Sequence, residues 1–332
     1  MKINIAGLIL IALSAQVTAQ QKPAPIIDMH IHANHANFAG PPPVTLCIYN
    51  EEWPAASMGP VWGDSLVAAS KKCRRQVISA LTDDEVMNKS IAIMNRRNVI
   101  GVTSGRLTEK WKAAAPDRII SGFYYRSDGK DPSPDSVRKL FKDGRYTVLG
   151  EIAAQYNGVG PADPELAPYW ALAEEMNIPA GIHIGPGPIG APYLGWNKYR
   201  ASLHSPLQLE EVIMRHPRLR VYIMHAAWPM IDELLAMLWT HPQVHVDISG
   251  IITDLSRPAF YSYLKKIVEA GFIKRIMFGS DQMIWPQLIE EAIKTIEEAD
   301  FLTASQKRDI FYNNAARFLN LSKEEIRKHH GN

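Results

Sequence analysis

The sequence predicts an α/β protein, a (β/α)8 TIM barrel with an insertion after its first strand, and three observations support this. From residue 26 onward, strand-like and helix-like segments alternate, which is typical of parallel sheets. Eight apolar segments have the length of a buried strand. No linker or repeat divides the chain, and a single barrel commonly runs to about 250 residues. An open doubly wound sheet is the alternative, but no G-x-G-x-x-G follows an early strand.

The composition narrows the class of protein. Of the 332 residues, 46% are hydrophobic and 21% are charged, which is ordinary for a globular protein and excludes disordered, collagen-like and disulfide-dense chains. The net charge of +2 argues against nucleic-acid binding, so we expect a small-molecule substrate. A homodimer is left open. The 11 histidines stand out, because histidine is the commonest metal ligand and general base.

The first residues have the pattern of a secretory signal peptide. Lys2 supplies a positive charge, Ile5 to Leu13 is an apolar run too short to span a bilayer, and Val17-Thr18-Ala19 places small residues before Gln20. We expect residues 1–19 to be removed, and the mature protein to be periplasmic or secreted with no stable membrane anchor. A short membrane anchor is the alternative.

The remaining chain divides into a barrel at 20–321 and a short polar tail at 322–332. Helical patterns lie between the strand candidates; Ile231, Leu234 and Leu238 share one helix face, and Thr82 precedes an acidic first turn. The strands are predicted at 26–32, 99–103, 118–124, 147–152, 180–184, 219–225, 244–248 and 275–278.

The segment 34–81 is too long for a simple loop between a strand and a helix, so we expect an insertion over the barrel mouth. It contains Cys47 and Cys73, the only two cysteines. In an exported protein such a pair is a disulfide candidate, and the closed loop would add about 3.5 kcal/mol of stability by the chain-entropy model. Two unpaired, buried thiols are the alternative.

The first predicted strand carries two inward histidines. Side chains alternate along a strand, so Asp28, His30 and His32 share the face that points into the barrel. Two buried imidazoles cost free energy unless something binds them, and a metal ion would do so. Two hydrogen-bonded structural histidines are the alternative.

Four more polar residues end later strands: Glu151, His183, His225 and Asp281. In a barrel, the carboxyl ends of all strands meet at one mouth, where active sites lie. Four histidines and two carboxylates there would suit a divalent ion, zinc in first place and manganese or iron otherwise.

This set of residues resembles the amidohydrolase superfamily over residues 26–321, and most closely its amidohydrolase-related branch, which includes aminocarboxymuconate-semialdehyde decarboxylase. Supporting segments lie at 216–220, 225–229 and 313–319. The resemblance implies that a metal is held by His30, His32, His183 and Asp281, and that His225 acts in catalysis.

The resemblance implies one ion rather than two. No Lys lies on the fourth strand, where many two-metal members carry a carboxylated one, and a single metal is usual in this branch. Glu151 would then be a catalytic carboxylate that contacts the substrate or a metal ligand. It also resembles the bridging Glu of TatD-type members, so two ions stay open.

The charges of these residues indicate a reaction. The metal would lower the pKa of a water, Asp281 would take its proton and pass it to the leaving group, and His225 would stabilise the oxyanion or activate the water. We expect an exported hydrolase that uses a metal-activated water on an amide, lactone or ester carbonyl. The alternative is a metal-dependent, non-oxidative decarboxylase of an aromatic or unsaturated carboxylic acid; a barrel that only binds its ligand is a third reading.

Candidate substrate residues follow other strands. Arg106 and Arg126 come after the second and third strands, where either would clamp a substrate carboxylate. Trp196 and Trp228 lie in loops after the fifth and sixth strands and would line an apolar pocket. A surface position for the arginines and core or rim packing for the tryptophans are the alternatives.

Overall fold

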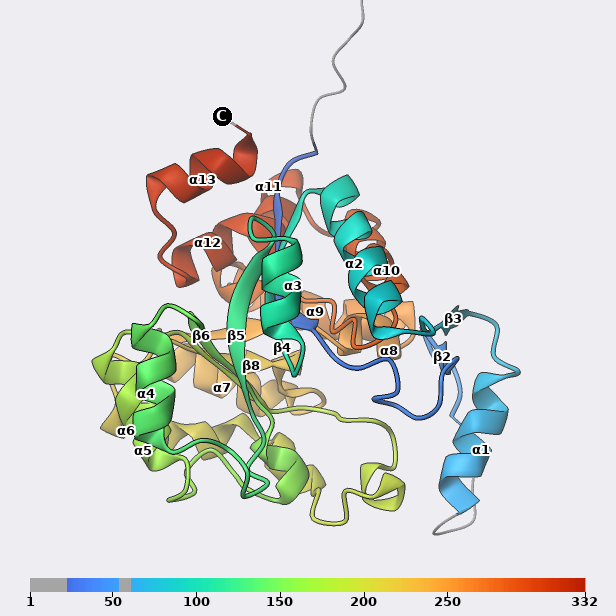
Figure 1. The fold of residues 1–332 in the computed structure, drawn as a ribbon, viewed down its shortest axis with the longest axis horizontal. Helices are drawn as coiled ribbons and strands as arrows, with labels where there is room; N and C mark the ends of the chain where they lie inside the picture. Colours follow the sequence, from blue (N-terminus) through green and yellow to red (C-terminus); the bar gives the residue numbers. More distant parts are fainter. Residues whose placement is uncertain (1–22, 54–60, 332) are drawn as a thin grey trace, which may run out of the picture.

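The computed structural model describes residues 23–53 and 61–331, so the predicted signal peptide lies outside the described residues. Eight parallel strands form one sheet in the order β1-β4-β5-β6-β7-β8-β9-β10, with helices around it (Figure 1). Two backbone hydrogen bonds join the ends of the sheet, from Met29 N to Phe278 O at 2.8 Å and from Asp281 N to His30 O at 2.9 Å. The sheet is therefore a nearly closed barrel, and the predicted fold class is confirmed.

All eight predicted strands are present; β1 has the predicted bounds, and no end of the others differs by more than two residues. The largest difference is at β8, which begins two residues later than predicted and ends one residue earlier, because His225 turns out of the strand into a helical turn. The strands are β1 (Ile26–His32), β4 (Val99–Ser104), β5 (Ile119–Tyr125), β6 (Val148–Ile152), β7 (Ala180–His183), β8 (Val221–Met224), β9 (Val244–Asp247) and β10 (Ile276–Met277).

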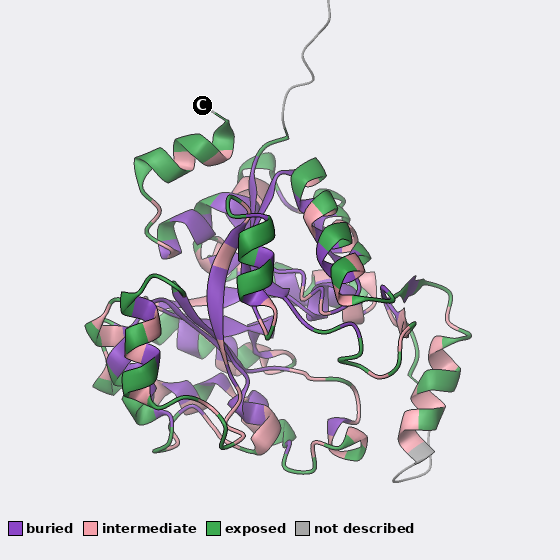
Figure 2. Ribbon diagram, viewed as in Figure 1, coloured by how far each residue is buried: buried purple, intermediate pink, exposed green. Residues whose placement is uncertain are grey.

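Amphipathic helices cover the outside of the barrel, and their buried faces form the core against the strands (Figure 2). The predicted start at Thr82 is correct, since its side chain accepts a hydrogen bond from Glu85 N and caps α2. The helices that lie against the barrel include α2 (Asp83–Arg97), α3 (Thr108–Ala114), α4 (Pro134–Lys142), α5 (Ala167–Glu175), α6 (Glu210–Arg215), α7 (Ile231–Thr240), α9 (Arg257–Glu269) and α10 (Gln287–Glu297). No helix of the described ranges is both long enough and apolar enough to cross a membrane.

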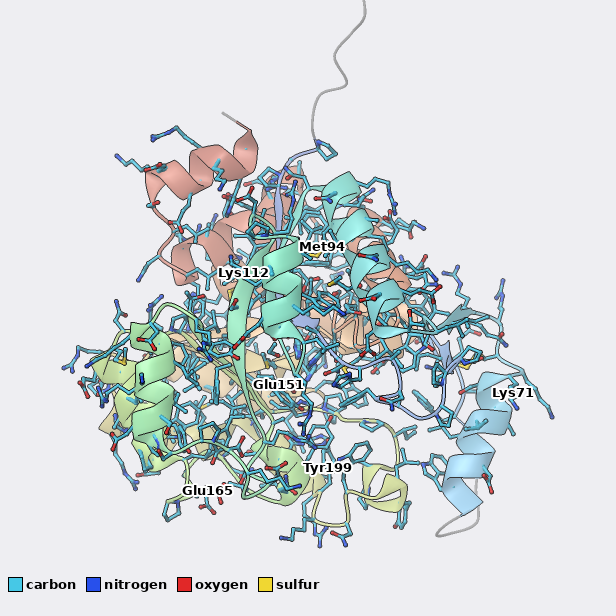
Figure 3. The ribbon with its side chains drawn as sticks, in the orientation of Figure 1. Lys71, Met94, Lys112, Glu151, Glu165 and Tyr199 are labelled. Atoms are coloured by element: carbon cyan, nitrogen blue, oxygen red, sulfur yellow. A yellow bond between two sulfur atoms is a disulfide. The ribbon has the colours of Figure 1, made fainter. Side chains whose placement is uncertain are left out.

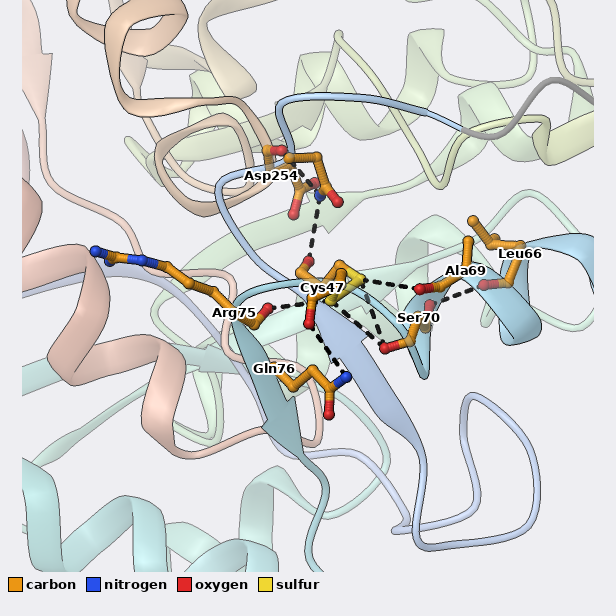
Figure 4. The surroundings of a disulfide bond; sticks show 9 residues. Cys47, Leu66, Ala69, Ser70, Arg75, Gln76 and Asp254 are labelled. Carbon is orange, nitrogen blue, oxygen red and sulfur yellow. Dashed lines mark hydrogen bonds between the residues drawn. A yellow bond between two sulfur atoms is a disulfide. The ribbon is translucent and has the colours of Figure 1, made fainter.

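The segment predicted as an insertion forms a small unit beside the barrel. It consists of β2 (Thr45–Cys47), α1 (Val61–Ser70) and β3 (Gln76–Ile78), with β2 and β3 paired antiparallel. A disulfide joins Cys47 to Cys73, with their Cα atoms 6.1 Å apart (Figure 4).

Two contacts fix this unit to loops at the barrel mouth. Asn50 Nδ2 donates to the carbonyl oxygens of Cys47, at 3.3 Å, and Asp254, at 3.1 Å, which ties the disulfide to the short helix α8 (Ile251–Asp254). Trp62 Nε1 donates to Ile189 O at 2.8 Å, in the loop that follows β7. The insertion therefore leans on the loops after β7 and β9.

The polar tail is an ordered helix, α13 (Lys323–His330). Ser322 and Glu325 cap its start reciprocally. The helix contacts the opposite end of the barrel from the mouth, because Asn98 Nδ2 donates to His329 O at 3.2 Å and Tyr312 Oη lies 3.0 Å from His329 Nδ1. Because the helix is polar and has no buried face, the sequence did not predict this contact.

We expect loss of the disulfide to loosen the insertion and leave the barrel folded. Cys73→Ser removes a loop closure over 26 positions, worth about 3.5 kcal/mol at most by the chain-entropy model. Hydrogen exchange should therefore rise in residues 44–80 and stay constant in β4 to β9. Two reactive thiols in denatured, unreduced wild-type protein would contradict the disulfide.

Candidate active site

The six predicted catalytic and metal-binding residues meet at the carboxyl ends of the strands. His30 and His32 lie on β1, Glu151 on β6 and His183 at the end of β7, while His225 and Asp281 directly follow β8 and the chain after β10. Five of them are buried, and the Asp281 side chain keeps 20% of its surface exposed. In Figure 3, Glu151 lies among the side chains at the centre of the molecule.

The two histidines of β1 point their Nε2 atoms at each other, 3.0 Å apart. Asp281 Oδ1 lies 3.1 Å from His32 Nε2 and 3.8 Å from His30 Nε2. Glu151 Oε2 lies 3.5 Å from His32 Nε2 and 3.7 Å from His30 Nε2. Two imidazole nitrogens and two carboxylate oxygens therefore face one small volume.

His183 and His225 form a second pair beside Glu151. His183 Nδ1 lies 2.7 Å from Glu151 Oε1 and 3.0 Å from His225 Nε2. His225 Nδ1 lies 3.0 Å from the carbonyl oxygen of Ser249, which can only accept. We therefore assign the proton of His225 to Nδ1, and that of His183 to the Nδ1 that faces the carboxylate. His225 Nε2 is then an acceptor, and the buried His183 Nε2 carries a lone pair with no hydrogen-bond partner.

Asp247 and Ser249, which sequence reasoning did not select, hold this arrangement in place from the end of β9. Ser249 Oγ donates to Asp247 Oδ1 at 2.6 Å and lies 2.8 Å from His30 Nδ1. Asp247 Oδ1 also accepts from His225 N at 3.0 Å. The rule that selected Glu151, a carboxylate at the end of a strand, would also have selected Asp247.

The backbone around the site adopts unusual conformations. His225, Ala226 and Ala227 have φ values of 60°, 45° and 53°, and Asp281 has a φ of 52°. Residues with side chains rarely occupy this left-handed region, and such strain is concentrated at functional sites. Gly250, with a φ of 65°, allows close approach, since a Cβ there would lie 2.9 Å from His225 Nδ1.

Burial and neighbouring charges shift the pKa values of the site residues in different directions. Burial, together with the neighbouring imidazole of His183, lowers the pKa of His225 to about 4, so the His225 imidazole is neutral. Burial alone would lower the pKa of His30, but the charges of Asp281, Asp247 and Glu151 raise it well above its usual value. Burial would raise the pKa of Asp281, but His30 and His32 outweigh it and hold that pKa low.

The donor set fits a divalent metal ion. Two nitrogens bound tetrahedrally 2.0–2.1 Å from one zinc ion would be about 3.3 Å apart, close to the 3.0 Å that separates the two Nε2 atoms of β1. The carboxylate that His183 Nδ1 faces and the hydroxyl beside His30 Nδ1 are the partners that usually orient ligating imidazoles. Buried atoms without hydrogen-bond partners, His183 Nε2 and Asp281 Oδ1, remain as ligand atoms.

Three groups of described residues lie close enough to hold an ion: His30, His32 and Glu151; Glu151, His183 and His225; and His30, His225 and Asp281. The four expected ligands of a single ion do not all fall in one group. His183 belongs to the group with His225, and Glu151 is shared with the histidines of β1.

The predicted substrate residues differ in their positions. Arg106 is exposed, and Arg126 is partly exposed with its Nε 3.6 Å from Asp128 Oδ2. The ring of Trp196 lies 5.4 Å from that of Tyr156, close to the site, whereas Trp228 packs on the core. Tyr124 and Tyr156, also beside the site, were missed because tyrosine carries no metal-binding pattern.

The family model that matches the chain is described as amidohydrolase, and it covers residues 27–321. The chain belongs to the amidohydrolase family. The expected superfamily is thus confirmed over most of the chain, and with it an enzyme class that includes metal-dependent members.

Among solved structures, a TIM-barrel protein from Bordetella bronchiseptica is similar with a TM-score of 0.58 and 15% identity, over 93% of this amidohydrolase chain and all of the other. The manganese-bound 5-carboxyvanillate decarboxylase from Novosphingobium aromaticivorans has a TM-score of 0.56 and 13% identity, over 91% and 98%. A probable 2-pyrone-4,6-dicarboxylic acid hydrolase from Acinetobacter baumannii has a TM-score of 0.55 and 16% identity, over 89% and 99%.

One curated relative, protein fluG from Emericella nidulans, is 22% identical over 129 residues. The match covers 39% of this chain and only 14% of the relative's length. The neighbours include both decarboxylases and a hydrolase, so they leave the reaction of this amidohydrolase open.

We expect Asp247→Asn to weaken metal binding by roughly 10- to 100-fold, because the carboxylate that orients His30 and His225 is lost. Competition with a chromogenic chelator would measure this affinity. Asp309→Asn is the matched control, since Asp309 is also a buried carboxylate but pairs with Lys274 away from the mouth. Equal metal affinity in the two variants would contradict the positioning role of Asp247.

Proposed function

We propose that this amidohydrolase is a metal-dependent hydrolase of an amide, lactone or ester. A divalent ion, zinc in first place, would be held by His30, His32, His183 and Asp281, and when bound it would lower the pKa of a water and polarise a carbonyl. The observation that carries the proposal is the position of Asp281. Its Oδ1 lies 3.1 Å from His32 Nε2 yet has no hydrogen-bonding geometry there, so this carboxylate keeps lone pairs free for an ion and for a proton.

The residues divide the proton transfers between them. Asp281 accepts the proton of the attacking water and later passes it to the leaving group. His225 is neutral, with its proton on Nδ1 toward Ser249 O, so its Nε2 is available as a second acceptor that activates the water. Glu151 keeps His183 oriented through the 2.7 Å contact to Nδ1 and contacts the substrate from its other oxygen.

The charge of the site supports a neutral substrate over an anionic one. Glu151, Asp247 and Asp281 pair only with histidines; no Lys or Arg of the described residues forms an ion pair with them. The decarboxylase alternative needs a cation for the substrate carboxylate. Arg126 is the candidate for this role, because its charge acts on the nearby Tyr124 hydroxyl.

The products distinguish the two reactions. We expect a screen of lactones, esters and amides in H₂¹⁸O to yield an acid that carries one ¹⁸O atom, detected by mass spectrometry. Aryl carboxylic acids belong in the same screen. Release of CO₂ without incorporation of ¹⁸O into the product would overturn the hydrolase and establish the decarboxylase.

We expect wild-type protein to hold one equivalent of metal, and Asp281→Asn to keep most of it while turnover falls by about 10²–10⁴-fold, because the proton acceptor is removed. Elemental analysis and rates on the best substrate of the screen test this, with Asp309→Asn as the control. Near-normal rates in Asp281→Asn would refute the proton transfer. Two equivalents in wild type would make Glu151 a bridge between the His30–His32 and His183–His225 groups.

We further propose that the protein is exported to the periplasm or beyond. The pattern of residues 1–19 and the Cys47–Cys73 disulfide support this, because disulfides persist in oxidising compartments. A mature protein that begins at Gln20 would agree with export, and an intact Met1 would contradict it.

A further inference from the structure

Two tyrosines line the site without a role in the chemistry described above. Tyr124, the next-to-last residue of β5, points into the barrel, while its neighbours Phe123 and Tyr125 pack outward against Phe141 and Tyr169. The Tyr124 ring lies edge-on to His32, with centroids 6.1 Å apart.

Tyr156 lies in the helical turn Ala154–Asn157 directly after β6, the strand that carries Glu151. Its ring is 4.9 Å from the ring of His183 and 5.4 Å from those of Trp196 and Tyr199. Tyr124 and Tyr156 therefore flank the two histidine pairs from adjacent strands, one beside His32 and the other beside His183.

Neither hydroxyl of these two tyrosines has a hydrogen-bond partner within residues 23–53 and 61–331, although neighbouring tyrosines do. Tyr125 Oη donates to Glu165 at 3.1 Å, and Tyr199 Oη donates to Gly185 O at 2.9 Å. Both residues are only partly buried, so water reaches them in the free protein. The two hydroxyls are therefore donors that a molecule in the site can take over from water.

Charge keeps both hydroxyls protonated. Burial raises the pKa of Tyr124 and of Tyr156, and the carboxylates of Glu151 and Asp281 raise both further. The charge that Tyr124 would carry if ionised raises the pKa of Tyr156 as well. Both hydroxyls therefore retain their protons as donors at neutral pH.

We propose that Tyr124 and Tyr156 contact the substrate and donate hydrogen bonds to the carbonyl oxygen on which negative charge develops. This assignment rests on the proposed hydrolytic function. Donors placed where charge develops stabilise the addition intermediate more than the substrate, which accelerates the reaction. The ligand chemistry is that of a tetrahedral oxyanion or the carbonyl that precedes it.

Gly187 is part of the same arrangement. A Cβ at this position would lie 2.8 Å from Tyr156 Oη, so glycine leaves the space that the hydroxyl occupies. Gly187→Ala is therefore a second way to disturb the Tyr156 hydroxyl without changing the tyrosine.

The test measures binding of phenylphosphonate, a tetrahedral anion, to the zinc-loaded full-length protein by calorimetry. We expect Tyr124→Phe and Tyr156→Phe each to weaken binding about tenfold, the value of one hydrogen bond to an anion. Gly187→Ala should weaken it similarly, and Gly187→Ala combined with Tyr156→Phe should bind no worse than Tyr156→Phe alone. Tyr125→Phe, on the outward face of the same strand, is the control that should bind as wild type does.

Zinc content is measured for every variant, so that a lost metal is not taken for a lost contact. Wild-type affinity in both Tyr→Phe variants would overturn the proposal and leave the hydrolase standing. A loss in one variant alone would assign the contact to that tyrosine and exclude the other. Zinc-loaded wild type that does not bind the phosphonate would overturn both the oxyanion contact and the hydrolytic function.

Discussion

The buried carboxylate of Glu151 is the interaction on which the site depends. One of its oxygens lies 2.7 Å from His183 Nδ1, and the other lies within 3.7 Å of both Nε2 atoms on β1. Burial would normally neutralise such a group, but its histidine partners lower its pKa well below the usual value. A single charge on β6 therefore stabilises side chains from β1 and β7, and joins the two histidine pairs.

The barrel makes this possible because parallel strands bring residues far apart in the sequence to one end. Asp247, at the end of β9, is a second carboxylate that holds side chains from other strands. It contacts His30 through the hydroxyl of Ser249, and it accepts a hydrogen bond from the backbone N–H of His225. The site is thus held between two carboxylates, on β6 and β9. The left-handed turn at His225 follows from this constraint, since the hydrogen bond to Asp247 and the contact to Ser249 O fix both ends of that residue.

The strands and the six residues that meet at the mouth could be predicted because each carries a local pattern: an apolar run, and a His, Asp or Glu where that run ends. Asp247 satisfied the same rule and could have been predicted with them. Tyr124 and Tyr156 could not be found this way, since a tyrosine beside such a site looks like any core tyrosine in sequence. The ordered α13 was missed because its contacts with Asn98 and Tyr312 join distant parts of the chain.

The insertion reaches the candidate site indirectly, through loops that also carry residues of that site. Tyr49 N donates to Thr253 O at 2.6 Å, within the helix α8 that follows Gly250, and Gly250 packs against His225. Trp62 holds the loop after β7, where a Cβ on Gly190 would collide with its indole, and that loop continues to Trp196 beside Tyr156. The Cys47–Cys73 disulfide joins the segments of the insertion that make these two contacts. The insertion, whose sequence is the hardest to interpret, thus supports the loops after β7 and β9. Differences in substrate choice among barrels with the same site residues would arise in these loops.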